Sequence, residues 1–339
     1  MTDDAIRSSP VAPAPLALFS FGMGALGTRV ADALGTVLAP HEEREFEWGQ
    51  HKCRPLADVR GHDAVVIGAL HGDERFSVND RLCRLLFFLA ALRDHGATRV
   101  SAIVPFLCYS RKDRRTKPHD PVTTRYVAQL FEAVGVDHVA TIEVHNTAAF
   151  DNAFRCPTTH IDAAPVVADW LARAYGDQAL VAASPDSGGI KRARHYADVL
   201  GARLGRPVPL AFVEKYRSDD VVSGGTVVGE VADRLVVLID DLIAGGTTLA
   251  RAAAACRAAG ARAVVAAAVH GAFASGAAAT LAAAPLERIA VLDHLPATAL
   301  DPAFVASRLQ LLPGAGLIAD AIRTLRGTGG TRPTGADRP

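Results

Sequence analysis

Residues 235–254 read LVVLIDDLIAGGTTLARAAA, and this stretch decides the fold. Its first five residues, Leu235 to Ile239, are all apolar, as is typical of a strand buried on both faces of a parallel sheet. Two carboxylates, Asp240 and Asp241, follow where that strand is expected to end. A turn containing two glycines then leads into an alanine-rich segment of helical composition. The order strand, turn, helix predicts an α/β protein.

The turn at residues 244–248, AGGTT, is suited to binding a phosphate group. Its glycines let several backbone N–H groups converge, and the helix that follows adds unpaired amides and the positive end of its dipole. Asp240 and Asp241 would repel a phosphate, but carboxylates suit neutral sugar hydroxyls or a metal ion. A plain strand-to-helix connection is the alternative, although this acidic pair falls where α/β proteins bind ligands. A Walker A loop is excluded, because no lysine follows the glycines. The whole stretch therefore suits a sugar phosphate.

Strand-like and helix-like segments alternate along the rest of the chain. Strands are expected at 16–21, 63–70, 99–107, 138–142, 179–184, 208–213, 235–239 and 262–269, and helices at 24–34, 79–95, 122–134, 164–175, 188–204 and 247–259. This alternation predicts parallel sheets with helices on both faces. A proline-containing break near Cys156 and Pro157 interrupts the pattern, which then restarts. We therefore predict two α/β domains, 15–157 and 158–326, between disordered tails at 1–14 and 327–339.

Composition excludes several classes of protein. The 339 residues include 36 basic and 36 acidic ones, so no polyanion-binding surface and no nucleic-acid partner are expected. Five cysteines without paired spacing argue against a disulfide framework or a zinc site. No apolar run approaches the ~20 residues that span a bilayer, and the N-terminus lacks the basic region of a secretory signal. A cytoplasmic protein without a membrane partner is expected.

A strongly cationic segment follows the strand expected at 99–107. Residues 106–115 read FLCYSRKDRR and place four cations within five residues. A solvated charged loop is the ordinary explanation of such a run. At the carboxyl end of a strand, however, guanidinium groups are well placed to hold a polyphosphate.

The chain resembles the ribose-phosphate diphosphokinases (PRPP synthetases) from about residue 40 to about residue 325. The segments that carry this resemblance, in order, are FLCYSRKDRR (106–115), PVTTRYVAQLFEAVGVD (121–137), TIEVH (141–145), ASPDSGGIKRAR (183–194), VEKYR (213–217) and the acid–glycine loop at 240–248. The last segment alone is also similar to type I phosphoribosyltransferases. The resemblance implies two consecutive phosphoribosyltransferase-like (Rossmann-like) domains, with parallel sheets flanked by helices. It also implies an active site between domains and between subunits, hence a homo-oligomer, either a dimer or a hexamer.

The activity that the resemblance implies is that of a kinase-type transferase in nucleotide biosynthesis. Such enzymes transfer the diphosphoryl group of ATP to the C1 hydroxyl of ribose 5-phosphate, with Mg²⁺, and release AMP. The first domain would provide the ATP-binding side, and the second the sugar-phosphate loop and a catalytic flap at 218–225. The residues at the family's functional positions are Arg111, Lys112, Asp113, Trp48, Gly49 and Gln50 for ATP; His145 and Asp186 for the metal; Lys215 and Arg217 for catalysis; and Arg217, Asp240, Asp241, Ala244, Gly245, Gly246, Thr247 and Thr248 for ribose 5-phosphate.

This sequence departs from the family pattern at several of these positions. Lys112 stands where the family has Gln, Trp48 and Gln50 replace an Asp and a Glu, and Ala244 replaces an Asp. Two alternatives therefore stay open. One is a phosphoribosyltransferase that consumes the same diphosphate, and the other is a non-catalytic paralogue that regulates a true synthetase.

Overall fold

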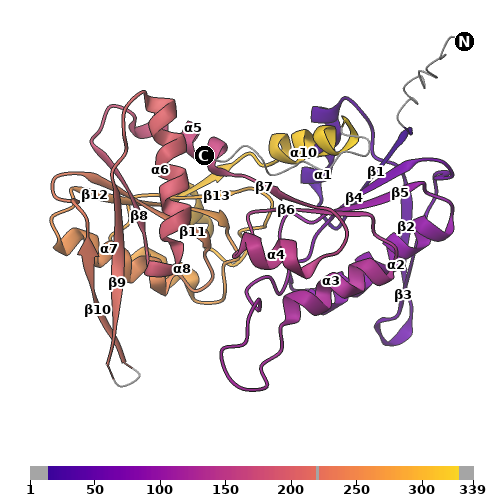
Figure 1. The fold of residues 1–339 in the computed structure, drawn as a ribbon, viewed down its shortest axis with the longest axis horizontal. Helices are drawn as coiled ribbons and strands as arrows, with labels where there is room; N and C mark the ends of the chain where they lie inside the picture. Colours follow the sequence, from indigo (N-terminus) through magenta and orange to yellow (C-terminus); the bar gives the residue numbers. More distant parts are fainter. Residues whose placement is uncertain (1–13, 219–220, 328–339) are drawn as a thin grey trace, which may run out of the picture.

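The computed structural model describes residues 14–218 and 221–327, which form two lobes side by side (Figure 1). Each lobe is built on one sheet. The elements of the first lobe are β1 (Leu16–Phe21), α1 (Ala25–Leu34), β2 (His41–Glu45), the 3-10 turn η1 (Glu47–Gly49), β3 (His51–Pro55), β4 (Asp63–Gly68), α2 (Val78–Asp94), β5 (Arg99–Ile103), α3 (Thr123–Ala133), β6 (His138–Ile142), α4 (Thr147–Ala153) and β7 (Thr158–Ile161). Those of the remaining chain are α5 (Ala164–Tyr175), β8 (Leu180–Ser184), η2 (Ser187–Gly189), α6 (Ile190–Leu204), β9 (Leu210–Ser218), β10 (Val221–Val228), β11 (Leu235–Leu242), α7 (Thr247–Ala258), β12 (Ala263–His270), α8 (Ala277–Ala283), β13 (Ile289–Leu292), α9 (Pro302–Arg308), β14 (Leu309–Leu312) and α10 (Ala315–Gly327).

The first sheet has the strand order β1-β4-β5-β6-β7, and all of its described pairings are parallel. Every residue of β4 and β6 is buried, as expected for strands covered on both faces. A separate antiparallel hairpin, β2–β3, lies at the outer end of this lobe (Figure 1). The predicted α/β class with helix-flanked parallel sheets is confirmed.

The second sheet has the order β10-β9-β8-β11-β12-β13-β14 and is parallel except for the β9–β10 pair. The deciding stretch supplies its central strand, because β11 lies between β8 and β12. Residues 235–239 are buried, as predicted. The strand continues to Leu242, however, so Asp240 and Asp241 lie within its last residues and are held in extended backbone.

The β9–β10 hairpin was missed by the sequence analysis, which expected a strand ending at residue 213 and a flap at 218–225. β9 instead runs to Ser218, and β10 pairs with it up to residues 219–220, which lie outside the described part of the chain. The register of the pair shifts between Val222 and Gly225. A Cβ on Gly225 would lie 2.5 Å from Val213 Cγ1. The hairpin projects from the second lobe (Figure 1).

Strand pairing and helix packing both cross the boundary predicted at residues 157/158. β7 pairs with β6 and so extends the first sheet beyond residue 157. At the other end of the chain, α10 leaves the second sheet and packs beside α1 (Figure 1). Arg326 Nε lies 3.3 Å from Asp63 Oδ2 at the start of β4. Two elements that follow residue 157, β7 and α10, therefore pack on the first lobe and join it to the second.

One buried core continues from lobe to lobe. Leu18 of the first sheet, Val237 of the second and Ile322 of α10 are all buried within a single apolar cluster. The outer faces of the two sheets have separate cores, covered by α2, α3 and α4 in one case and by α7, α8 and α9 in the other. All five cysteines are free thiols. Of the tails predicted at 1–14 and 327–339, only residues 14 and 327 are described, and none of the described helices is both long and apolar enough to cross a bilayer.

Candidate active site

A pocket of about 230 Å³ lies where the two lobes meet. Its walls come from the loop after β5, the segment after β6, the end of β11 and the end of β12. Ligand sites of parallel α/β sheets form at such carboxyl ends of strands. The lining residues are Phe106, Leu107, Tyr109, Ser110, Arg111, Glu143, His145, Asp241, Leu242, His270 and Ala272.

The two carboxylates at the end of β11 lie in different environments. Asp240 Oδ1 accepts a hydrogen bond from the Asp241 backbone N–H at 2.9 Å. Burial, together with the neighbouring Asp241 carboxylate, raises the pKa of Asp240. Burial would also raise the pKa of Asp241, but the hydrogen bond from His145 and the Arg192 guanidinium outweigh it and lower that pKa. The environments therefore shift the two pKa values in opposite directions, so that Asp240 binds a proton more readily than Asp241.

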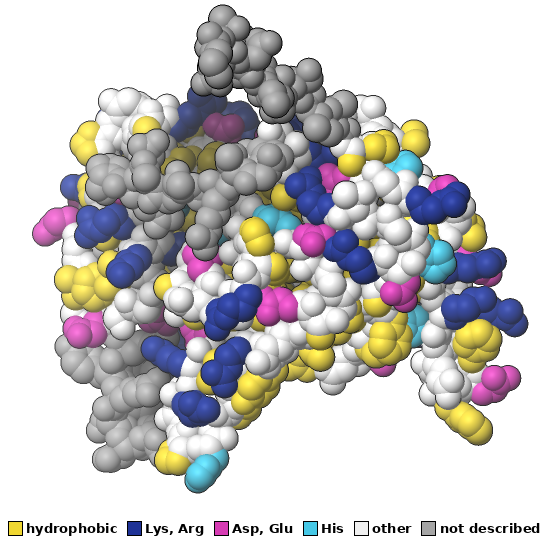
Figure 2. All heavy atoms as spheres, turned by 45° about the vertical axis from the view of Figure 1, so that its right-hand side comes forward, with side chains coloured by type: hydrophobic (Ala, Val, Ile, Leu, Met, Phe, Trp, Pro, Cys, Tyr) yellow, Lys and Arg dark blue, Asp and Glu magenta, His cyan; other side chains and the backbone are white. Residues whose placement is uncertain are grey.

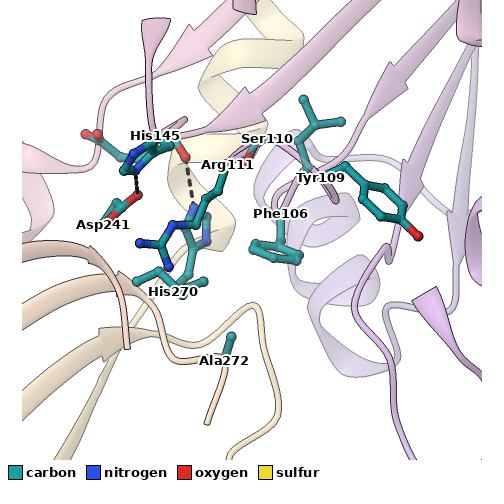
Figure 3. Close-up of a pocket in the computed structure, with 11 residues that line it drawn as sticks. Phe106, Tyr109, Ser110, Arg111, His145, Asp241, His270 and Ala272 are labelled. Atoms are coloured by element: carbon teal, nitrogen blue, oxygen red, sulfur yellow. Dashed lines mark hydrogen bonds and ion pairs between the residues drawn. The ribbon is translucent and has the colours of Figure 1, made fainter. Parts of the chain in front are cut away.

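Asp241 joins the two lobes through His145. His145 Nδ1 lies 2.7 Å from Asp241 Oδ2, and the two side chains are in direct contact at one side of the pocket (Figure 3). Asp241 is 6% exposed at its side chain and His145 is 37% exposed. The pair thus fixes the imidazole ring through Nδ1 and leaves Nε2 for another partner.

A second carboxylate, Glu143, is buried behind this pair. Arg192 of α6 lies between the two acids, with Nε 3.8 Å from Glu143 Oε2 and Nη1 3.7 Å from Asp241 Oδ1. His160 Nε2 lies 3.7 Å from Glu143 Oε2. Burial would raise the pKa of Glu143, but His160 and Arg192 together lower it. Acidic and basic side chains from both lobes therefore alternate on this polar side of the pocket.

Two histidines, at the end of β12 and just after β13, extend this polar network, and the first of them, His270, lines the pocket. His270 Nε2 lies 2.9 Å from the Glu143 carbonyl oxygen, and His270 Nδ1 lies 2.7 Å from His294 Nε2. Both rings are buried, and burial lowers the pKa of each. Two neutral imidazoles can form this chain only if His294 donates to His270 and His270 donates to the carbonyl. The edge of His270 also packs on the Phe106 ring, with centroids 5.2 Å apart.

The predicted phosphate turn follows β11 directly but does not line the pocket itself. Gly246 has φ +77° and precedes α7, so the turn leads straight into a helix N-terminus. Within the described chain, the backbone amides of residues 245–248 donate to no protein group. Their free N–H groups at the start of a helix form the anion-binding arrangement that the sequence predicts.

The cationic segment contributes Arg111 to the pocket. Its side chain reaches from the first lobe over His270 towards Asp241, whereas Tyr109 is turned away (Figure 3). Lys112 is exposed and does not line the pocket. Asp113 accepts a hydrogen bond from Asn146 Nδ2 at 2.9 Å, which ties the segment to the residue after His145. Figure 2 shows cations and carboxylates interspersed over the described part of one face, as expected from the balanced charge.

The other predicted site residues lie outside the pocket. Trp48 and Gly49 are part of η1 at the tip of the β2–β3 hairpin, and Gln50 follows them. Asp186 begins the turn η2, where its Oδ1 accepts from the Gly188 N–H at 3.0 Å. The backbones of Lys215 and Arg217 lie in β9, opposite Gly225 and Val222 of β10, and their side chains are outside the described part of the structure.

The sequence analysis missed Arg192, Glu143 and His270 as site residues. Two of them gave a usable signal. Glu143 and His270 are polar residues at or just after the ends of apolar strands, which is the signal that identified Asp240 and Asp241. Arg192 lies in the helix that follows the Asp186 turn, and only its tertiary contacts distinguish it from the neighbouring cations of α6.

Comparison with known proteins decides the family. The N-terminal domain of ribose phosphate pyrophosphokinase matches residues 18–135, and the phosphoribosyl transferase domain matches residues 160–280. The chain belongs to the ribose-phosphate pyrophosphokinase family. It is 32% identical to ribose-phosphate pyrophosphokinase 1 of Streptococcus pyogenes over 235 residues, which cover 68% of this chain and 70% of the relative. It is 34% identical to the ribose-phosphate pyrophosphokinase of Mycobacterium bovis over 232 residues, which cover 68% of each.

A solved structure agrees with this assignment. Phosphoribosylpyrophosphate synthetase from Mycobacterium smegmatis has a TM-score of 0.83 and 31% identity, and it covers 93% of this chain and 100% of its own. The chain is therefore an enzyme with the two-part fold that the sequence predicted. The match to the family's N-terminal domain also accounts for the first half of the chain, which a phosphoribosyltransferase alone would leave without a role.

Proposed function

We propose that the protein transfers the diphosphoryl group of ATP to the C1 hydroxyl of ribose 5-phosphate and releases AMP. The observation that carries this proposal is the pairing of His145 with Asp241 across the two lobes, beside Arg111 and on the strand that leads into the amides of 245–248. A sugar-phosphate half-site and a polyphosphate half-site would thereby be adjacent. A transfer between two bound substrates needs this juxtaposition.

The sugar phosphate would bind along the end of β11. The amides of residues 245–248 and the hydroxyls of Thr247 and Thr248 would hold the 5-phosphate. Asp240, whose pKa is raised, can both donate to and accept from ribose hydroxyls when protonated. Ala244 offers no side-chain polar group there, so recognition of the sugar would depend mainly on Asp240 and Asp241.

The diphosphoryl group would be held by cations rather than by a covalent intermediate. Arg111 faces the pocket from the first lobe. Lys215 and Arg217, on the strand that leads into the β9–β10 hairpin, would meet the group from the second. Cations that close over the transferring group stabilise its developing charge and exclude water. Lys112 and Asp113 would hold the nucleotide further along the same segment.

The donor set is compatible with a magnesium ion carried in by ATP. His145 has Nε2 available once Nδ1 is bound to Asp241, and Asp186 offers a carboxylate on the neighbouring lobe. Mg²⁺ binds few protein groups and takes its other ligands from phosphates and water. When bound, it would neutralise charge on the polyphosphate. His145 and Asp186 are the residues that would hold it.

We also propose a cytoplasmic homo-oligomer, a dimer or hexamer. Trp48 is 97% exposed in η1, which joins the strands of the β2–β3 hairpin at the outer end of the first lobe, and it does not line the pocket (Figure 1). An aromatic side chain so exposed is typical of a surface that contacts a partner. Through such a contact, Trp48, Gly49 and Gln50 would reach the nucleotide bound to a neighbouring subunit.

The decisive experiment measures two products with the pure protein and Mg²⁺. AMP formed from ATP only when ribose 5-phosphate is present supports the proposal. Pyrophosphate formed from phosphoribosyl diphosphate and a nucleobase, without AMP formation, identifies a phosphoribosyltransferase instead. An inactive protein that changes the kinetics of an added synthetase identifies a regulatory paralogue. Either of the latter results refutes the proposal.

A further inference from the structure

Arg192 makes contacts with three groups that belong to the two lobes. Besides lying between Glu143 and Asp241, it points Nη2 at the backbone carbonyl oxygen of His145, at 3.4 Å. Its side chain is 14% exposed, so most of the side chain is removed from water. Glu143 and His145 follow β6 of the first lobe, whereas Asp241 ends β11 of the second. A single planar group thus meets both halves of the pocket wall.

The segment that Arg192 contacts needs support, because its backbone is in an unusual conformation. Glu143 has φ +38°, in the left-handed region that residues with a Cβ rarely adopt. Its N–H donates to the Ile161 carbonyl at 3.1 Å, and its own carbonyl is bonded by His270. Such a conformation persists only when its surroundings hold it in place. His145, which bonds to Asp241, lies two residues after this turn.

We propose that Arg192 is a positioning residue of this enzyme: it holds the Glu143–His145 segment of one lobe and Asp241 of the other in a single arrangement before substrates bind. Its guanidinium is directed at protein groups, and it does not line the pocket. It therefore acts through Asp241 and His145 and not on the reacting atoms. Arginine suits this role because its donors point in several fixed directions from one plane. The inference rests on the proposed function and adds a positioning residue to its site.

The test compares substitutions at Arg192 with a matched control on the same helix. Arg194 is exposed, two residues further along α6, and Arg194→Gln is expected to keep kcat and KM unchanged. Arg192→Gln should lower kcat/KM for ribose 5-phosphate by about tenfold to a hundredfold, mainly through kcat, since misplaced groups lose transition-state contacts. Arg192→Lys should recover only part of this loss, because one ammonium cannot reach all three groups.

Two further measurements separate positioning from a general structural role. Methylguanidinium added to Arg192→Ala should restore part of kcat, which a merely destabilised protein would not show. In a double-mutant cycle with Glu143→Gln, the double variant should lose much less activity than the product of the losses in the two single variants, because both residues act through the same segment. Thermal melts confirm that each variant is folded at the assay temperature.

The possible results bear on different claims. If the wild-type protein forms no AMP from ATP and ribose 5-phosphate, the proposed function itself fails. If the wild type is active, a folded Arg192→Gln with wild-type kcat/KM overturns the positioning role, as do independent losses in the cycle. Should Arg192→Gln not fold, the charge-balanced double variant Glu143→Gln/Arg192→Gln replaces it. Wild-type activity in that double variant would overturn the role equally, and a lower kcat in a folded double variant supports it.

Discussion

Replacing Gly246 by alanine tests whether the phosphate turn has the backbone geometry described above. Gly246 has φ +77°, and a Cβ there would lie 2.7 Å from Leu281 Cδ2 and 2.8 Å from Leu281 Cγ. The left-handed conformation costs an alanine about 1–2 kcal/mol. Because Leu281 is fully buried, relieving the clash adds about 1–3 kcal/mol of overpacking. We expect Gly246→Ala to lower the free energy of unfolding by about 2–5 kcal/mol.

Gly245 provides the matched control. It is the adjacent glycine of the same turn, no atom lies within 4 Å of the place where its Cβ would be, and it is not among the described glycines with positive φ. Gly245→Ala should therefore leave stability unchanged or raise it by up to about 1 kcal/mol, since alanine reduces the entropy of the unfolded chain.

The assay is urea unfolding followed by circular dichroism, with both variants and the wild type in one buffer. Kinetics at a temperature where all three are folded should give a higher KM for ribose 5-phosphate in Gly246→Ala, because the turn must shift to relieve the clash. The reasoning is refuted if the unfolding free energies of the two variants agree within about 0.5 kcal/mol, the scatter of ordinary surface changes.

Three other predictions follow from separate parts of the molecule. Lys215→Ala should lower kcat by orders of magnitude with little change in Tm, and wild-type turnover would remove Lys215 from its role. Burial, aided by repulsion from Arg99, lowers the pKa of His138 to about 4. The unfolded chain therefore binds this proton first as the pH falls, and stability should drop by about 2 kcal/mol between pH 7 and pH 5. In urea titrations, His138→Gln should remove this part of the decrease in unfolding free energy between pH 7 and pH 5. A variant whose unfolding free energy depends on pH as in the wild type would contradict the assignment. Trp48→Ala should leave the Tm of the subunit nearly unchanged but reduce the assembly seen by sedimentation; an unaltered oligomer would exclude Trp48 from the subunit contact.

The sequence predicted the features that depend on local order along the chain. Apolar runs alternating with helical periodicity predicted the α/β class, since burial of parallel strands on both faces requires that pattern. The acidic pair and glycine turn after residues 235–239 were recognised because strand ends, turns and helix starts have compositional signals of their own. The helical N-terminus after Gly246 and the free amides before it agree with that interpretation. The β10 strand escaped notice, because its glycines and polar residues give no apolar alternation until it pairs with β9.

The tertiary structure decided which of these local features meet. His145 and Asp241 are 96 positions apart, yet they form a 2.7 Å pair, because β6 and β11 end at the same place between the lobes. The return of α10 to α1 and the continuous core behind it hold the lobes in that relation. Arg192 showed no sign of its role in the sequence, because a cation on an amphipathic helix is ordinarily a solvated one. Its part in the site comes from distances between groups that only the folded chain brings together.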